Sequence, residues 1–133
     1  MEESVSIALT VVKAYLNKTK NEAITKLESG MLHIHVPEGG IPKDGPSAGI
    51  TMASALLSNF TGASIPKRIA MTGELSLSGK VLAVGGIREK LTAAKRENID
   101  LVILPKATKL QYEDIPKEVH EGMDVKFVDH IDE

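Results

Sequence analysis

The sequence contains no cysteine and no tryptophan, and aromatic residues make up only 3% of its 133 residues. The absence of cysteine excludes disulfides, thiolate nucleophiles and cysteine-ligated metals. With so few aromatic rings, the core must be built from Leu, Ile, Val, Ala and Met, and 42% of the residues are hydrophobic. A chain of this length is most often one domain. We therefore expect a single domain over residues 1–133.

An excess of one charge and a long hydrophobic run are also lacking. The formal net charge is -2, so nothing indicates nucleic-acid binding. No apolar run reaches the length of a membrane span. The first residues, Met1-Glu2-Glu3-Ser4, lack the basic region and apolar core of a signal peptide. The four histidines do not have metal-ligand spacing. We expect a cytoplasmic domain without a membrane partner and without a metal site.

Hydrophobic periodicity predicts three main helices, over residues 4–18, 47–60 and 87–97. Apolar runs between turn residues predict strands at 31–36, 69–72, 100–104 and 124–128, and a hairpin over 75–84. Residues 17–28 give little signal and are expected to form a loop that contains at most a short helical turn. A short helix is expected at 109–114, and a linker or helical turn at 115–120. Strand–helix–strand order favours parallel pairing, whereas the hairpin is antiparallel. The predicted fold class is α/β (α+β), a mixed sheet packed by helices.

One stretch rich in turn residues precedes the helix at 47–60; it reads Pro42-Lys43-Asp44-Gly45-Pro46-Ser47-Ala48-Gly49. The turn residues lie before Ser47 and the apolar helical pattern follows it, so the stretch presents one hydroxyl at the start of a helix. Backbone N–H groups at a helix start are unpaired and carry partial positive charge. We therefore expect Ser47 to lie beside an oxyanion site formed by backbone N–H groups of Ser47 and Ala48.

A nucleophilic serine needs a proton acceptor within hydrogen-bond reach, and two kinds of candidate exist. His33 and His35 share one face of the expected strand, but two solvent-facing histidines are ordinary on a strand, and the G-x-S-x-G elbow of hydrolases is absent. Lys90 lies in the first turn of the helix after Gly85-Gly86, where the helix dipole disfavours a cation. Burial there would lower its pKa toward that of a working base. The alternative is a plain surface lysine.

Three blocks carry a resemblance to a known family. They are residues 42–49, Met71-Thr72-Gly73-Glu74, and Gly85-Gly86-Ile87-Arg88-Glu89-Lys90-Leu91. In this order they resemble the signature blocks of the Lon protease proteolytic domain, and the Lys-Asp pair ahead of Gly-Pro-Ser-Ala-Gly resembles the A-type. The likeness continues through residues 33–39 and 102–105 and covers essentially the whole chain.

The resemblance implies a Lon-protease-type fold, of the ribosomal protein S5 domain 2-like kind, and a Ser–Lys dyad with Ser47 as nucleophile and Lys90 as general base. It implies ATP-dependent degradation of misfolded and regulatory proteins by a homohexamer. In that family an ATPase module and an N-terminal substrate-binding region precede this domain, so the chain is expected to be a fragment. No Walker A motif is present, because the closest stretch, Gly73 to Lys80, has the wrong spacing. ATP and Mg are expected in the missing ATPase domain, and no cofactor is expected here.

Four supporting residues are expected around the dyad: Thr72, Asp44, His35 and Glu74. A hydroxyl at Thr72 would hold a neutral amine without adding negative charge, or would make only a turn bond. Asp44 would act as a gate that keeps Lys90 protonated, or would stabilise the turn. His35 would line the site without being the base, and Glu74 would contact another subunit or a loop, or would be a solvated acid. The segment 32–36, or its neighbour 38–40, could pair with substrate backbone.

Two other functions remain open from the sequence. The loop from Gly45 to Gly49 would also suit a phosphate cradle, as in small-molecule kinases with a related Gly-Ser-Ser-Ala loop. That interpretation needs further nucleotide-binding blocks, which the sequence does not contain. A non-catalytic oligomerisation or adaptor domain is the other alternative, and it predicts that replacing Ser47 and Lys90 leaves function intact.

Overall fold

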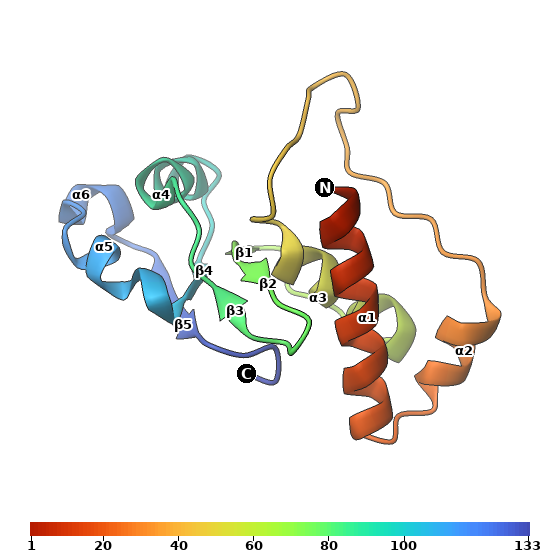
Figure 1. Ribbon diagram of the computed structural model, residues 1–133. Coiled ribbons are helices and arrows are strands. Elements are labelled where there is room, and N and C mark those ends of the chain that lie inside the picture. Colours follow the sequence, from red (N-terminus) through yellow and green to blue (C-terminus); the bar gives the residue numbers. More distant parts are fainter.

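The computed structural model describes residues 1–133 and shows two groups of helices with the strands between them (Figure 1). The elements in chain order are α1 (Glu2–Lys18), α2 (Ala23–Ser29), α3 (Gly49–Thr61), β1 (Ile69–Met71), β2 (Glu74–Leu75), β3 (Val81–Leu82), α4 (Ile87–Arg96), β4 (Leu101–Pro105), α5 (Lys109–Glu113), α6 (Lys117–His120) and β5 (Asp124–Val128). A short 3₁₀ helix, Lys106–Thr108, joins β4 to α5.

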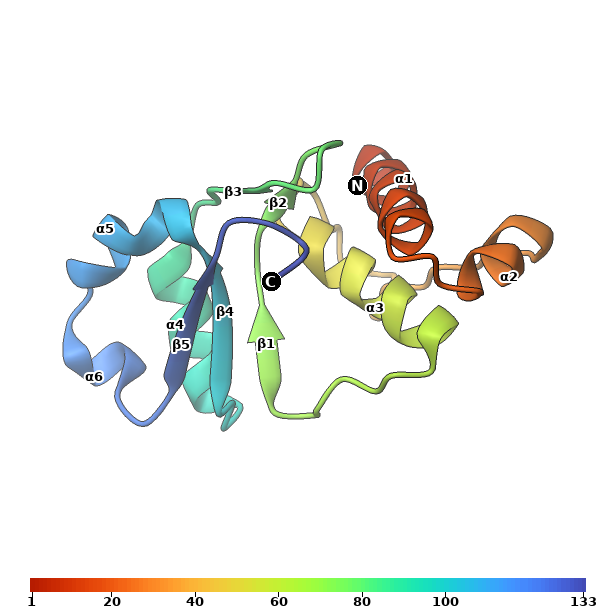
Figure 2. The same cartoon turned by 90° about the horizontal axis from the view of Figure 1, so that it is seen from below.

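Three strands form a parallel sheet in the order β1-β4-β5, with β4 in the centre (Figure 2). The register pairs Met71 with Ile103 across β1 and β4. Strands β2 and β3 form a separate antiparallel hairpin. The parallel connection from β1 to β4 contains this hairpin and α4, and such crossovers place a helix against one face of the sheet.

The period-2 alternation of the strands assigns each side chain to one of two faces. On β4, Val102 and Leu104 pack in a cluster with α4, whereas Ile103 packs in the cluster that contains α3. Met71, the partner of Ile103, packs in the α3 cluster as well. Thr72, the next residue, is therefore directed to the α4 side, and this turns its hydroxyl toward Lys90.

Two hydrophobic clusters stabilise the two halves of the molecule. The first joins α1, α2 and α3 to the hairpin and includes Leu16, Ala53 and Val81, each almost fully buried. The second lies between α4 and the sheet and includes Leu91 and Leu104, which have no exposed surface. The residues of the candidate site lie where the two clusters meet.

The start of α3 approaches the hairpin very closely, and Gly49 permits it. A Cβ placed on Gly49 would lie 2.9 Å from the backbone N of Leu75 and 3.1 Å from its Cβ, closer than side chains tolerate. At the other end of α3, Gly62 has a φ of 76°, the left-handed conformation typical of a C′ glycine. Gly62 therefore ends α3.

Most of the predicted elements are confirmed, with small shifts of their ends. The mixed α/β class is correct, as are the hairpin, the three other strands from residue 69 onward, and the three main helices. Helix α1 begins at Glu2 and not at Ser4, and α3 begins at Gly49, two residues after Ser47. The segment expected at 17–28 to be a loop with at most a short helical turn holds more helix than that, because α2 packs Ala23 and Leu27 into the first cluster.

The predicted strand at 31–36 is also wrong. The chain there is extended, but no backbone N–H or C=O of residues 31–37 takes part in a backbone hydrogen bond. Alternation of apolar residues predicts an extended conformation, but a strand also needs a neighbour to pair with, which the local pattern does not specify. We call residues 31–37 the extended segment. The chain has no helix that is both long enough and apolar enough to span a membrane.

Candidate active site

The backbone of Ser47 is fixed by hydrogen bonds between the α3 start and the end of β1. The N–H of Gly73 donates to the carbonyl oxygen of Ser47 (2.9 Å), and the N–H of Ile50 donates to the carbonyl of Gly73 (3.2 Å). The hydroxyl of Thr72 donates to the same Ser47 carbonyl (3.1 Å). Ser47 thus precedes α3 in a position that β1 determines. We call this set of contacts the junction.

Lys90 reaches the junction from α4. Its Nζ donates to Thr72 Oγ1 over 3.1 Å. Gly86 is the N-cap of α4, with a φ of 70°, and its carbonyl accepts the N–H of Lys90. Lys90 therefore lies at the end of the first helical turn, as predicted, and its side chain is half-buried. Thr72 is only 7% exposed, so the contact is shielded from solvent on the Thr72 side.

Burial lowers the pKa of Lys90 below its ordinary value of 10.5, and no charged neighbour opposes this. No carboxylate forms an ion pair with Lys90. A cation without a counter-ion is disfavoured when it is desolvated, so the equilibrium shifts toward the neutral amine. The hydroxyl of Thr72 donates its only proton to the Ser47 carbonyl. It therefore accepts a hydrogen bond from Lys90 and does not donate one to it. The lone pair of a neutral Lys90 amine is therefore left free to accept a proton.

The backbone N–H groups of Ser47 and Ala48 donate to no acceptor of the chain, whereas those of Gly49 and Ile50 do. Two adjacent free donors beside a serine hydroxyl are a suitable arrangement for a developing oxyanion. The sequence analysis proposed this pair of donors. Their freedom is consistent with that role, which stays a prediction.

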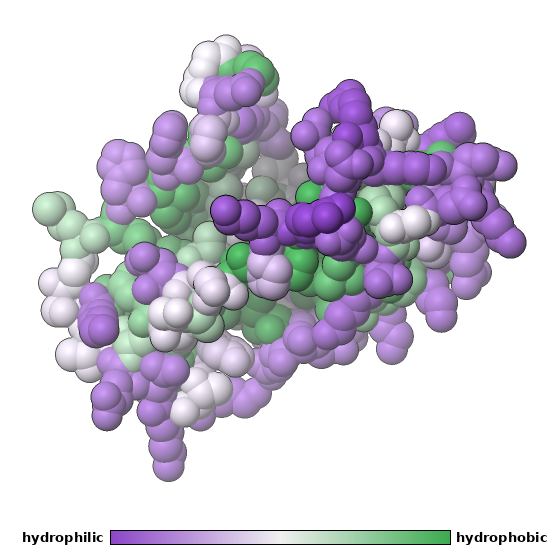
Figure 3. Space-filling view, turned by 180° about the vertical axis from the view of Figure 1, so that it is seen from behind, coloured by the Kyte–Doolittle hydropathy of each residue, from purple (hydrophilic) through white to green (hydrophobic).

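Ser47, Thr72 and Lys90 line one cavity of about 460 Å³, which we call the α4 cavity. A second cavity of about 450 Å³ lies between the extended segment and α3, and we call it the α3 cavity. Ala48 and Thr51 line both, so the two cavities adjoin at the first turn of α3. The surface seen from the α3 side is hydrophobic in its middle and hydrophilic along its rims (Figure 3).

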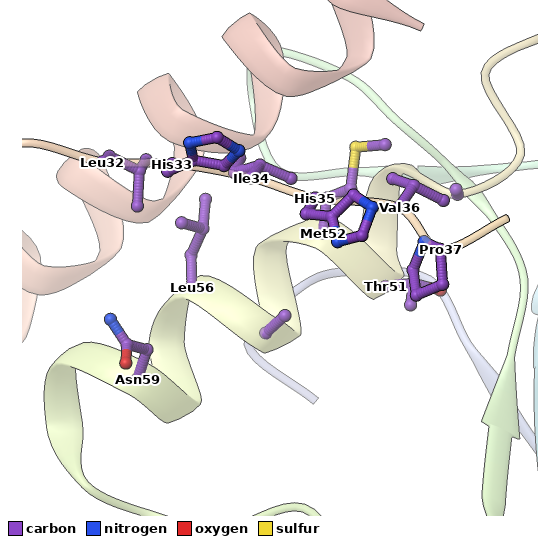
Figure 4. A pocket seen from close by; sticks show the side chains of 12 residues that line it. Leu32, His33, Ile34, His35, Val36, Pro37, Thr51, Met52, Leu56 and Asn59 are labelled. Carbon is purple, nitrogen blue, oxygen red and sulfur yellow. The ribbon is translucent and has the colours of Figure 1, made fainter. Parts of the chain in front are cut away.

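The two histidines of the extended segment lie in the α3 cavity and not with Lys90. His33 and His35 are exposed and line this cavity, and Leu56 points into it from α3 (Figure 4). Ser47 is not among its lining residues. Of the candidate bases, Lys90 is therefore the one that shares a cavity with the serine.

Asp44 and Glu74 lie apart from Lys90. Asp44 is exposed, and its carboxylate accepts the N–H of Gly45 over 2.8 Å, which is the turn-stabilising role. It forms no ion pair with Lys90, so the gating contact is not made in this conformation. Glu74 is half-buried on β2 and lines a small cavity with Glu3 and Pro46. No three His, Cys, Asp or Glu side chains gather where they could hold a metal ion.

Sequence reasoning missed the far walls of the α4 cavity. These consist mainly of small and apolar residues, namely Ala70, Met71, Ala93, Ala94, Ile99 and Val102, with Glu97. One signal was available: Ala93, Ala94 and Glu97 follow Lys90 at i+3, i+4 and i+7, so they lie on the same face of a helix. Thr51, whose hydroxyl donates to the Met71 carbonyl (3.3 Å), could not be found without the structure.

The comparisons with known proteins agree with this geometry. The family model described as the Lon protease (S16) C-terminal proteolytic domain matches residues 1–133. The Lon protease of Dictyoglomus thermophilum is 50% identical over 133 residues, which are 100% of this chain and 17% of that protein. The Lon protease of Desulforamulus reducens is 58% identical over 102 residues, 77% of this chain and 13% of its own length. A mitochondrial Lon protease homolog of Phaeodactylum tricornutum is 48% identical over 132 residues, 99% of this chain and 15% of its own length.

An α/β fold with a serine loop ahead of a helix and a full-length match to a protease family defines this chain as a peptidase domain. It belongs to the family of Lon protease C-terminal proteolytic domains. The chain spans about a sixth of the length of the curated relatives it matches, for example 17% and 16% of the first two. The resemblance seen in the three sequence blocks is therefore confirmed.

Proposed function

We propose that this domain hydrolyses peptide bonds with Ser47 as nucleophile and Lys90 as general base. The observation that carries the proposal is the position of Lys90: its Nζ lies 3.1 Å from Thr72 Oγ1, in the cavity that Ser47 also lines, without a carboxylate partner. A lysine can act as a base only when its neutral form is favoured, and burial lowers the pKa of Lys90 in that direction.

The mechanism follows from these groups. Neutral Lys90 accepts the proton of the Ser47 hydroxyl as the oxygen attacks the scissile carbonyl. The oxyanion of the tetrahedral intermediate accepts hydrogen bonds from the N–H groups of Ser47 and Ala48. Lys90 then donates its proton to the leaving amine, and an acyl-enzyme remains on Ser47. A water molecule, deprotonated by Lys90, hydrolyses this ester and restores the serine.

Thr72 keeps the amine in place through both proton transfers. Its hydroxyl accepts from Lys90 and donates to the carbonyl of Ser47, so it ties the base to the backbone of the nucleophile. Because this hydroxyl is neutral, it positions the amine without raising its pKa as a carboxylate would. Asp44 remains a candidate gate in another conformation of the loop at residues 38–46.

The extended segment is the candidate surface for the substrate backbone. Its N–H and C=O groups have no partners in the chain, and it borders the α3 cavity, which adjoins Ser47 through Ala48 and Thr51. An extended peptide could pair with it as an added strand. Main-chain pairing is independent of side chains, and it therefore suits a protease that accepts many sequences.

For the whole protein, we propose the function that the resemblance to Lon proteases implies. The curated relatives are Lon proteases several times longer than this chain. We infer ATP-dependent degradation of misfolded and regulatory proteins by a cytoplasmic homohexamer, with ATP and Mg bound outside residues 1–133. The adaptor alternative is disfavoured by the free N–H groups of Ser47 and Ala48 and by the half-buried Lys90 without a counter-ion, which a non-catalytic domain does not need. No observation favours the phosphate-cradle alternative.

The proposal is tested by cleavage of a short unstructured fluorogenic peptide between pH 6 and pH 10. The parent chain should show a rate that rises with pH until Lys90 is neutral, about tenfold per unit on the rising limb. Ser47→Ala and Lys90→Ala should each lose roughly 10³-fold or more in kcat. Lys90→Arg should be as inactive as Lys90→Ala, because arginine keeps its proton.

The control for unfolding is the circular dichroism spectrum of each variant, together with Lys95→Ala, which removes an exposed lysine of α4 that contacts α6. Lys95 does not line the α4 cavity. The dyad is wrong if Lys90→Ala cleaves the peptide as fast as the parent. It is also wrong if Ser47→Ala retains the pH-dependent activity.

A further inference from the structure

The α4 cavity extends well beyond the reactive groups along one face of a helix. From Lys90 it continues past Ala93 and Ala94 to Glu97, with Ile99 and Val102 on the opposite wall. Ala94 and Val102 are buried, and Ala93 is half-buried, so small side chains leave the space open. The charged groups lie only at the two ends, Lys90 beside Ser47 and exposed Glu97 at the mouth. The middle of the cavity is apolar.

The mechanism determines which part of a substrate this cavity can reach. The acyl side of the scissile bond has its carbonyl oxygen at the N–H groups of Ser47 and Ala48. The leaving amine must lie at Lys90 Nζ to receive its proton. The residue that carries this amine is the one directly after the scissile bond, and its side chain then starts at the Lys90 end of the α4 cavity.

We propose that the α4 cavity binds the side chain of the residue directly after the scissile bond and selects an apolar one, with Ala93 setting the size that fits. This inference rests on the proposed function, because it uses Lys90 as the donor to the leaving amine. Ala93 lies one helical turn from Lys90 and is half-buried, so a longer side chain there projects into the cavity and fills it. A polar side chain in the apolar middle would lose its water without gaining partners.

The test compares internally quenched peptides that differ only after the scissile bond, where one has Leu and the other Ser. For the parent chain, kcat/KM should favour the Leu peptide by about tenfold or more. In Ala93→Leu the preference should fall to about twofold or less, since the space is filled. Thr92→Leu adds the same side chain on the neighbouring, exposed position, which does not line the cavity, and it should keep the parent preference.

A second substrate separates this inference from the dyad. A peptide with Gly after the scissile bond has no side chain to place in the cavity, so its cleavage should be equal in parent and Ala93→Leu. Equal cleavage of the Leu and Ser peptides by the parent would overturn the inference and leave the peptidase intact. Loss of Gly-peptide cleavage in Ala93→Leu would also overturn it, because the substitution would then act on the dyad.

Binding supplies a readout that does not depend on turnover. Ser47→Ala is titrated with two tripeptide amides with free amino termini, Leu-Ala-Ala and Ser-Ala-Ala, and the methyl resonance of Ala93 is followed by NMR. The Leu peptide should bind about tenfold more tightly and shift Ala93, and Ala93→Leu should abolish the difference. If no substrate is cleaved, the proposed function fails, and this titration still decides whether the cavity selects an apolar side chain. The inference would be overturned if the two tripeptides bound with equal affinity, or if only resonances other than that of Ala93 shifted.

Discussion

The junction and the extended segment lie on either side of the same serine and are built in opposite ways. At the junction, Ser47 receives two hydrogen bonds on one carbonyl, and α3 and β1 are tied to each other through Gly73. In the extended segment, residues 31–37 make no backbone hydrogen bond at all. At the junction the carbonyl groups of Ser47 and Gly73 are satisfied by the chain itself, whereas the extended segment leaves its backbone groups free for a partner.

The proposed roles of the two regions, catalysis at the junction and peptide binding at the extended segment, account for the difference. Catalytic groups must keep their geometry between turnovers, so their positions are determined by buried backbone contacts. A surface that binds a varying peptide must keep donors and acceptors free until the peptide arrives. Such a surface has low local stability, because a backbone without hydrogen bonds is held only by side-chain packing.

The largest effect is expected when one hydroxyl, that of Thr72, is removed from the junction. Thr72→Val keeps the shape but releases Lys90 Nζ and removes one of two donors to the Ser47 carbonyl. We expect kcat to fall on the order of 100-fold, because a small misplacement of a catalytic group is costly. Thr72→Ser retains the hydroxyl and should keep most of the activity. Equal kinetics for the valine and serine variants would show that the hydroxyl does not position the base.

A second pair of substitutions compares the stability cost of a methyl group at two glycines. Gly49 lies at the tightly packed start of α3, and Gly39 lies in the open loop before it. Gly49→Ala places a methyl group 2.9 Å from the backbone N of Leu75, so we expect a loss of about 1–3 kcal/mol in the free energy of unfolding. Gly39→Ala is the matched control, because a Cβ at Gly39 meets nothing within 4 Å. It should change stability by about 0.5 kcal/mol or less. Urea denaturation measures both, and equal values would contradict the contrast.

The free energy of unfolding should depend on pH through the partly desolvated amine of Lys90. The pKa of Lys90 is lowered in the folded chain, so above that lowered value and up to about 10.5 the unfolded chain binds more protons than the folded one. Stability therefore rises with pH in this window through Lys90. Lys90→Met lacks the effect, so its stability relative to the parent should be most favourable near neutral pH and should decline toward pH 10.5.

Denaturation midpoints at several pH values measure this difference directly. Lys13→Met, a substitution of an exposed lysine on α1, is the comparison chain. A Lys90→Met curve that runs parallel to the parent curve across the alkaline range would mean that Lys90 is solvated.

The smallest effect on stability is expected in the extended segment. Leu32 is 37% exposed, so Leu32→Ala should cost about 0.5 kcal/mol or less. Hydrogen exchange should sharpen the contrast: the amides of residues 32–36 should exchange rapidly, and those of Ile50 and Gly73 slowly. Saturating peptide substrate bound to Ser47→Ala should slow exchange in residues 32–36. Slow exchange there without peptide would show that the segment is already paired.

The sequence predicted the elements whose signals are local. The pattern in α4 and the turn residues around Ser47 are examples, and three blocks in a fixed order identified the family. The strand at 31–36 was wrong because pairing depends on a neighbour that local alternation cannot supply. The walls of the α4 cavity were missed because Ile99 and Val102 come together with Lys90 only when β4 packs against α4. Thr72 was placed beside Lys90 correctly, although the second bond from its hydroxyl to the Ser47 carbonyl was not foreseen.

The central claim is that Lys90 is a neutral base held by Thr72, and the most direct test is the pKa of Lys90 itself. The chain is labelled with ¹³C-lysine, the Lys90 resonance is assigned with Lys90→Arg, and each lysine is titrated by NMR. Lys90 should titrate below its ordinary value of 10.5, at the midpoint of the rising limb of peptide cleavage. A Lys90 that titrates at 10.5, or away from the midpoint of the rate profile, would contradict the account.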